Sequence, residues 1–184
     1  MPDQTGRLHG KVAIVTGAGS TPGPGVGTGK ATAIVMAREG AKVVCVDLHP
    51  ERAEETRAVI EDEGGTALVV AADCTSNADC EAMVAAAVDA FGTVDVLVNN
   101  IGLAALGTVV DTTEEAWDRA LDINLRTAFL ASKHVVPVMA AQGSGSIVMI
   151  SSISALRGDG TVAYSAAKGA LLAMTVDMAY SHGR

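Results

Sequence analysis

The fold is decided by residues 11–19, which read KVAIVTGAG. The apolar run Val12 to Val15 is typical of a short strand that helices cover on both faces. The glycines after Thr16 end this strand, and the segment near 28–39 has the composition of a helix. A strand that passes through a glycine turn into a helix is the first unit of an α/β fold.

The same alternation continues along the chain. Strands are expected at roughly 11–16, 42–47, 67–72, 94–98 and 146–151, and helices near 28–39, 50–63, 77–91, 113–141 (with a break allowed) and 162–181. No linker, repeat or charge block divides the sequence. We therefore predict one α/β domain over residues 1–184, a doubly wound parallel sheet in three layers.

Composition excludes several classes of function. The formal charge is -8 and only 3% of residues are aromatic, so a nucleic-acid surface is not expected. No apolar stretch approaches the ~20 residues that span a bilayer, and the first residues lack a signal peptide, which favours a cytoplasmic protein without membrane contact. Cys45, Cys74 and Cys80 have no ligand-like spacing, so we expect reduced thiols and no metal.

The glycine turn suits a pyrophosphate, because backbone N–H groups and a helix N-terminus can surround it. Asp47 ends the second strand, where an acid accepts hydrogen bonds from an adenosine ribose and repels a 2′-phosphate. The alternative for Asp47 is a helix cap before Pro50.

The adjacent Gly29 and Lys30 raise an alternative for the same turn, the magnesium-dependent P-loop of nucleotide-binding proteins. Ala31 stands where Ser or Thr should hold magnesium, and Pro24 replaces the leading glycine. This alternative is therefore not favoured.

Tyr164 and Lys168 are four residues apart, a spacing that puts both on one face of a helix. The ammonium would favour the phenolate of Tyr164 and so prepare it for proton transfer. The alternative is a half-buried Tyr beside a solvated Lys. Ser152 stands twelve residues before Tyr164, after the fifth strand.

These features together resemble the short-chain dehydrogenase/reductase family over essentially the whole chain. The residues that carry the resemblance are Thr16-Gly17-Ala18-Gly19, Asp73, Asn99-Asn100-Ile101-Gly102, Asn124, Ser151-Ser152 and Tyr164 with Lys168. The resemblance implies a Rossmann-like sheet of order 3-2-1-4-5.

The resemblance also implies roles. Tyr164 would exchange a proton with the substrate oxygen, and Ser152 would donate a hydrogen bond to that oxygen. Lys168 would assist Tyr164 and hold the nicotinamide ribose, and Asn124 would hold a water that passes protons from Lys168. The cofactor-binding residues would be Gly17, Gly27, Gly29, Asp47, Asp73, Asn99, Tyr164 and Lys168.

The resemblance therefore implies an oxidoreductase that transfers a hydride between NAD and a secondary alcohol or ketone. NADP is less expected because of Asp47. An NADPH-dependent reductase of the 3-oxoacyl-carrier-protein type and a non-catalytic nucleotide-binding protein are the alternatives. A homodimer or homotetramer is expected.

Two departures from the family pattern stand out. Six extra residues, Thr21 to Val26, interrupt the glycine turn, and we expect them to bulge outward. The sequence also stops after the helix that carries Tyr164, before the last two strands of the family. We therefore expect a C-terminally truncated domain with an uncovered fifth strand.

Overall fold

A computed structural model describes residues 6–23 and 25–183. Within them lies one parallel sheet, whose strands are β1 Val12–Thr16, β2 Lys42–Asp47, β3 Thr66–Ala71, β4 Val96–Asn99 and β5 Ser146–Met149. The order is β3-β2-β1-β4-β5, which confirms the predicted order 3-2-1-4-5. In the described residues β5 pairs with β4 alone, so it forms an edge of the sheet.

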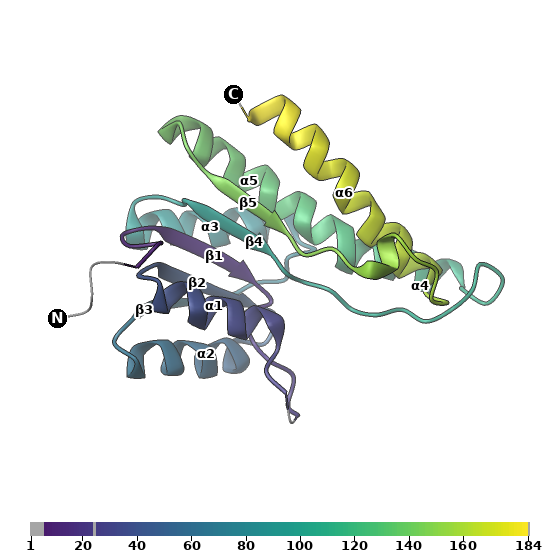
Figure 1. Ribbon diagram of the computed structural model, residues 1–184, viewed down its shortest axis with the longest axis horizontal. Coiled ribbons are helices and arrows are strands. Elements are labelled where there is room, and N and C mark those ends of the chain that lie inside the picture. The colour runs from purple at the N-terminus through teal and green to yellow at the C-terminus, as the bar shows by residue number, and fades with distance from the viewer. Residues whose placement is uncertain (1–5, 24, 184) are drawn as a thin grey trace.

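Helices cover both faces of the sheet (Figure 1). They are α1 Thr28–Arg38, α2 Pro50–Asp62, α3 Asn77–Phe91, α4 Glu114–Leu121, α5 Thr127–Gln142 and α6 Val162–His182. A π-helical turn, Asp122–Arg126, joins α4 to α5, and a 3-10 turn, Ile153–Ala155, precedes α6. The predicted helix 113–141 is thus broken, as the sequence analysis allowed.

The apolar strands bury both of their faces. In β1, Ala13 and Val15 belong to the core cluster that contains the buried residues of α1 and α2, whereas Ile14 belongs to the cluster with those of α3 and α5. Successive side chains of a strand point to opposite faces, so a strand between two helical layers needs an apolar residue at every position.

Helix ends follow local capping chemistry. Ser76 accepts a hydrogen bond from the backbone of Asp79 at the start of α3, and Thr113 accepts one from Ala116 at the start of α4. Gly92 ends α3 in the left-handed region, at a φ of 84°. These polar and glycine residues set where each helix begins and ends.

The three cysteines are free thiols buried in the sheet layers. Burial raises the pKa of Cys45 to about 12, which makes its thiolate a minor form at neutral pH. No helix among the described residues combines the length and the hydropathy that a membrane span requires.

Candidate functional site

The candidate site lies at the carboxyl ends of β1 and β4, where the strand order reverses. β1 pairs with β2 on one side and with β4 on the other, so the loops that follow β1 and β4 diverge to opposite faces of the sheet. In an open α/β sheet this switch point is where ligands bind.

The glycine turn is tight enough to exclude side chains. Gly17 has a φ of 63°, in the left-handed region that favours glycine. A Cβ on Gly29 would lie 1.9 Å from the carbonyl oxygen of Gly17, so α1 begins directly against the turn. Neither arrangement admits a larger residue, as a phosphate-binding turn requires.

The N-terminus of α1 has unshielded positive character. Its N-cap residue, Gly27, has no side chain to cap the helix, and no acid stands in the first turn. The helix dipole and the first N–H groups of the helix therefore favour an anion at this end.

The insertion projects from the turn as an exposed loop (Figure 1). The hydroxyl of Ser20 accepts a hydrogen bond of 2.9 Å from the backbone N–H of Gly27, which joins the two ends of the segment. Cβ atoms on Gly23 and Gly25 would meet nothing within 4 Å, and Val26 is 65% exposed. The expectation of an outward bulge is confirmed for these residues; Pro24 lies outside the described residues.

Asp47 joins the ends of β1 and β2. One oxygen of its carboxylate accepts 2.9 Å from the N–H of Gly19, and the other accepts 2.9 Å from the N–H of His49. Asp47 therefore holds the glycine turn and stands half-buried at the sheet edge, where an adenosine ribose would lie. The sequence analysis named Gly19 as part of the turn but assigned it no role; its N–H fixes this carboxylate.

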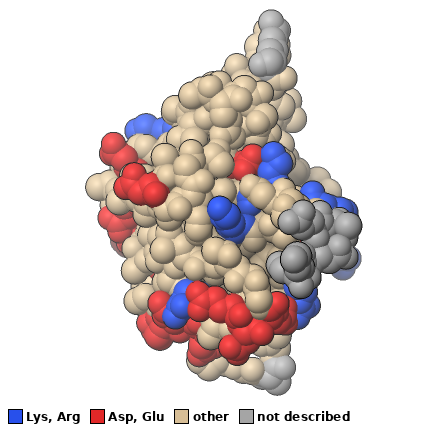
Figure 2. Space-filling model, turned by 90° about the vertical axis from the view of Figure 1, so that its left-hand side faces the viewer, with Lys and Arg blue, Asp and Glu red and all other residues tan. Residues whose placement is uncertain are grey.

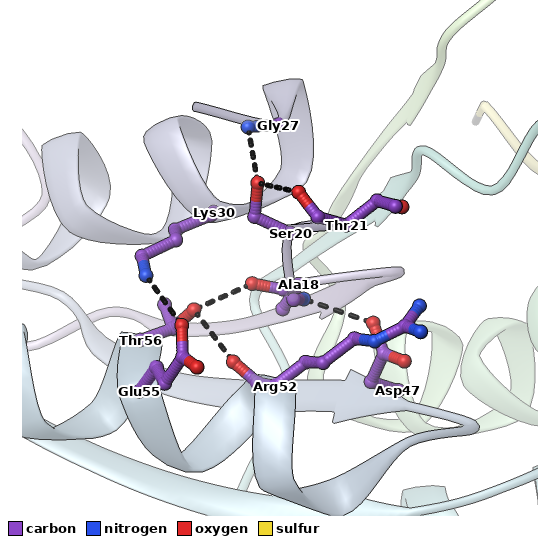
Figure 3. A network of polar contacts seen from close by, with 10 residues as sticks. Ala18, Ser20, Thr21, Gly27, Lys30, Asp47, Arg52, Glu55 and Thr56 are labelled. Carbon is purple, nitrogen blue, oxygen red and sulfur yellow. Dashed lines mark hydrogen bonds and ion pairs between the residues drawn. The ribbon is translucent and has the colours of Figure 1, made fainter. Parts of the chain in front are cut away.

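Lys30 does not point toward the turn. Its ammonium forms an ion pair of 3.2 Å with Glu55 of α2, and 17% of its side chain is exposed (Figure 3). This geometry agrees with the sequence argument against a magnesium-dependent phosphate loop.

The two asparagines at the end of β4, Asn99 within the strand and Asn100 just after it, have different environments. Asn99 is 4% exposed, and its amide donates 3.1 Å to the hydroxyl of Ser132 in α5. Asn100 instead donates 3.1 Å to both carbonyl oxygens of Thr16 and Gly17, and accepts 2.8 Å from the hydroxyl of Thr28.

This contrast bears on the predicted cofactor contact of Asn99. Its side chain points into the core between β4 and α5, so a side-chain contact at the sheet edge does not fit this geometry. Asn100 is the residue that ties the glycine turn and α1 to β4. Asn99 is the last residue of β4, whereas Asn100 lies just past its end and turns its side chain toward the end of β1 and the start of α1.

Asp73 lies exposed in the loop after β3. Its carboxylate accepts 2.9 Å from the N–H of Thr75 and 2.7 Å from the hydroxyl of the same residue. In the structure Asp73 thus organises its own turn, as Asp side chains often do. The predicted adenine contact stays a prediction.

Tyr164 and Lys168 meet on one face of α6. The Lys168 ammonium lies 5.9 Å from the centre of the Tyr164 ring. Lys168 is 2% exposed, and its ammonium donates 3.0 Å to the carbonyl oxygens of Ile101 and Ile150, one after β4 and one after β5. The predicted pairing of the two side chains is confirmed, and the alternative of a solvated Lys is wrong.

Burial lowers the pKa of Lys168 to about 8, because the charged form loses hydration. A Cβ on Gly102 would approach its ammonium within 3.0 Å, so the glycine makes room for it. Lys168 is therefore a buried cation that can change protonation state close to neutral pH.

The two serines after β5 use their hydroxyls differently. Ser151 donates 2.8 Å to the carbonyl oxygen of Lys168 and so anchors α6. Ser152 donates 3.2 Å to the hydroxyl of Ser154, which in turn donates to the carboxylate of Asp159. Since the hydroxyl of Ser151 is engaged in holding the helix, Ser152 is the better candidate to meet a substrate.

Asn124 sits in the π-helical turn and is 1% exposed. Its amide donates to the carbonyl oxygens of Leu103 and Ala120, and its oxygen accepts 2.9 Å from the N–H of Leu103. Both amide hydrogens are thus in use, one to hold the loop after β4 and the other on the last turn of α4. The predicted water relay stays a prediction.

These residues fit a dinucleotide cofactor. The glycine turn leaves no space for a Cβ, the helix start favours an anion, and Asp47 ends β2 beside it. Lys168 lies at the same carboxyl edge of the sheet, beside the ends of β4 and β5. Among residues 6–23 and 25–183 there is no cluster of three His, Cys, Asp or Glu side chains suited to a metal ion.

The chain is similar to known proteins over nearly its whole length. The family model described as short chain dehydrogenase matches residues 11–184. A crystal structure from Burkholderia xenovorans, described as a short-chain dehydrogenase/reductase, superimposes with a TM-score of 0.94 at 43% identity, covering 97% of this chain and 71% of that one.

Two further proteins are named for their substrates. A 7 alpha-hydroxysteroid dehydrogenase solved with NADH and a bile-acid ketone gives a TM-score of 0.90 at 33% identity, over 100% of this chain and 69% of that one. The 3-alpha-(or 20-beta)-hydroxysteroid dehydrogenase of Mycobacterium bovis is 41% identical over 97% of this chain and 66% of its own. The chain spans about two thirds of the length of the curated relatives that it matches.

Proposed function

The chain belongs to the short-chain dehydrogenase/reductase family, and we propose that it transfers a hydride between NAD and a secondary alcohol or ketone. The observation that carries the proposal is the position of Lys168, which sits under Tyr164 and bonds to the loops after β4 and β5. This position, at the carboxyl ends of β4 and β5, supports a proton-transfer role for the pair.

In the oxidation direction, the phenolate of Tyr164 takes the proton of the substrate hydroxyl as the hydride leaves the carbon. The bound nicotinamide supplies the hydride chemistry. Ser152 is half-buried and donates a hydrogen bond to the substrate oxygen in place of its bond to Ser154. In the reduction direction Tyr164 returns the proton.

Lys168 has one donor left for catalysis. An ammonium has three N–H donors, and the carbonyl oxygens of Ile101 and Ile150 accept two of them. The third is available to the nicotinamide ribose. Asn124 acts by fixing the loop that carries Ile101 and Leu103.

The preference for NAD is argued from Asp47. Its carboxylate is held in place by the N–H groups of Gly19 and His49, so it cannot easily turn away from a 2′-phosphate. Like-charge repulsion then disfavours NADP. The same argument disfavours an NADPH-dependent reductase of the 3-oxoacyl-carrier-protein type.

We also propose a homo-oligomer. The side chains of Phe129 on α5 and of Leu172 and Val176 on α6 are exposed by 51%, 43% and 72%. Large apolar side chains that gather on neighbouring helices are typical of an interface. Sedimentation equilibrium would measure the mass; a monomer at all concentrations would contradict the proposal.

The experiment that tests the function is a turnover assay with NAD and a mixed panel of secondary alcohols, repeated with NADP. We expect reduced nicotinamide to form with NAD at a higher kcat/KM than with NADP. Asp47→Ala should narrow the difference between the two cofactors. Equal or better use of NADP by the unchanged protein would contradict the assignment of Asp47.

A further inference from the structure

We propose that Arg52 is a specificity-determining residue for the cofactor: it would bind the 2′-phosphate of NADP and so retain measurable NADP affinity in spite of Asp47. The inference rests on the proposed function, because it takes the glycine turn and Asp47 as the adenosine end of the cofactor site. It concerns a residue that the sequence analysis did not consider.

Arg52 lies against the glycine turn. A Cβ built on Gly19 would come within 2.5 Å of the Arg52 Cβ and within 2.7 Å of the Asp47 carboxylate oxygen Oδ2. Gly19, Asp47 and Arg52 are therefore mutual neighbours. Figure 3 shows the guanidinium of Arg52 extended alongside the carboxylate of Asp47, on the same side of the turn.

The position of Arg52 is set by the fold. It is the third residue of α2, and its N–H donates 3.0 Å to the carbonyl oxygen of His49 in the first turn. Only two residues separate the end of β2 from the start of α2, so Asp47 and Arg52 cannot separate without unwinding this turn. The half-buried side chain has one end packed on Gly19 and its charged end at the sheet edge.

Arg52 is an unpaired cation in acidic surroundings. The helix α2 is rich in acids, and Figure 2 shows acidic side chains gathered over the lower part of the molecule, where α2 lies, on the side that is at the left in Figure 1. On α2, Arg57 pairs with Glu54 and Glu61 at 2.6 Å each, and Glu55 pairs with Lys30. Within the described part of the chain, the Arg52 guanidinium has no ion pair or hydrogen bond.

An unpaired guanidinium beside an acid that binds a ribose is suited to bind a phosphate on that ribose. Its planar fork matches the oxygens of a phosphate and binds them in a bidentate manner. An Arg near the ribose is also the general means by which this type of site accommodates a 2′-phosphate. Asp47 and Arg52 would then act in opposite directions, which gives preference for NAD without exclusion of NADP.

Two other roles for Arg52 make different predictions. A guanidinium that stacks on the adenine ring would strengthen NAD and NADP alike. A purely structural side chain, packed on Gly19, would affect the turn and hence every nucleotide. If Arg52 contacts the 2′-phosphate, its loss should weaken only the nucleotide that carries this phosphate and not the nucleotide that lacks it.

The test is a calorimetric titration of the whole chain with adenosine 5′-monophosphate and adenosine 2′,5′-bisphosphate. The variants are Arg52→Gln, which keeps the stem that packs on Gly19, and Arg52→Lys, which keeps the charge. Arg57→Gln is the matched control, an Arg of the same helix that is already paired with Glu54 and Glu61.

We expect Arg52→Gln to weaken the bisphosphate by about tenfold or more, as for a lost hydrogen bond to a charged group, with the monophosphate changed less than about twofold. Arg52→Lys should weaken binding of the bisphosphate less than Arg52→Gln does, and Arg57→Gln should not weaken it. Equal weakening of both ligands, or no change in either, would overturn the role of Arg52 alone. If the unchanged chain bound neither nucleotide, the proposed function would fail with it.

Discussion

The ammonium of Lys168 lies 5.9 Å from the centre of the Tyr164 ring, one helical turn away. The two residues differ in their surroundings, since Lys168 is buried between two backbone carbonyls and Tyr164 is half-buried at the sheet edge. A buried cation next to an accessible phenol is the arrangement that proton transfer at this site requires. It also makes the stability of the protein depend on pH.

Burial lowers the pKa of Lys168 from its ordinary 10.5 to about 8. Between these two values the unfolded chain binds more protons than the folded one, so the free energy of unfolding should rise with pH. The slope from one proton is at most about 1.4 kcal/mol per pH unit.

This slope can be measured by urea unfolding from pH 7.5 to 10.5 (roughly the window given by the two pKa values). Lys168→Met should remove it, whereas Lys42→Met, at an exposed position, should not. A slope that persists in Lys168→Met would mean that another group is responsible.

Gly29→Ala should disrupt the glycine turn, because its Cβ would lie 1.9 Å from the carbonyl oxygen of Gly17. We expect a loss of stability of about 2 kcal/mol or more, typical of overpacking, and weaker nucleotide binding. Gly25→Ala is the control, since a Cβ there meets nothing within 4 Å. If both variants unfolded at the same urea concentration as the unchanged protein, the packing of α1 on the turn would be in error.

Deletion of Thr21 to Val26 should leave the fold intact. The Ser20 hydroxyl and the Gly27 N–H are already 2.9 Å apart, so the ends of the segment can be joined. Shortening an exposed loop changes its closure free energy by only about 0.6 kcal/mol per halving of length. Thermal unfolding of the deletion variant should stay cooperative, and a broad transition would show that the segment packs inward.

Asn100→Ala should cost about 1–3 kcal/mol, because it leaves the carbonyl oxygens of Thr16 and Gly17 without this donor and the hydroxyl of Thr28 without this acceptor. The exposed Asn77→Ala serves as a control and should cost less. Chemical denaturation of both variants measures the difference. Equal costs would remove the role given to Asn100.

Much of the fold follows from local patterns. The strands and helices lie within about two residues of their predicted positions because apolar runs and caps are local signals. β4 begins at Val96 rather than at 94, since Asp95 is engaged with the N–H of Val12 and the ammonium of Lys11. A contact between residues that distant in sequence leaves no mark in a local pattern.

In the candidate site, too, some contacts could be predicted from local patterns and others could not. The pairing of Tyr164 with Lys168 could be predicted, because helix geometry alone sets it. The different contacts of Asn99 and Asn100 could not be predicted, since they depend on which neighbouring elements surround the end of β4. The position of Arg52 could not be predicted either, because it depends on how the first turn of α2 packs against Gly19.

The most direct test of the account is the turnover of Tyr164→Phe, which removes only a hydroxyl. With NAD and the alcohol on which the unchanged chain is most active, kcat should fall by about 10²- to 10⁴-fold, the loss expected for a general acid/base. Binding of NAD should change little, because the phenyl ring remains beside Lys168. Near-normal turnover by Tyr164→Phe would contradict the proposed catalytic role of Tyr164.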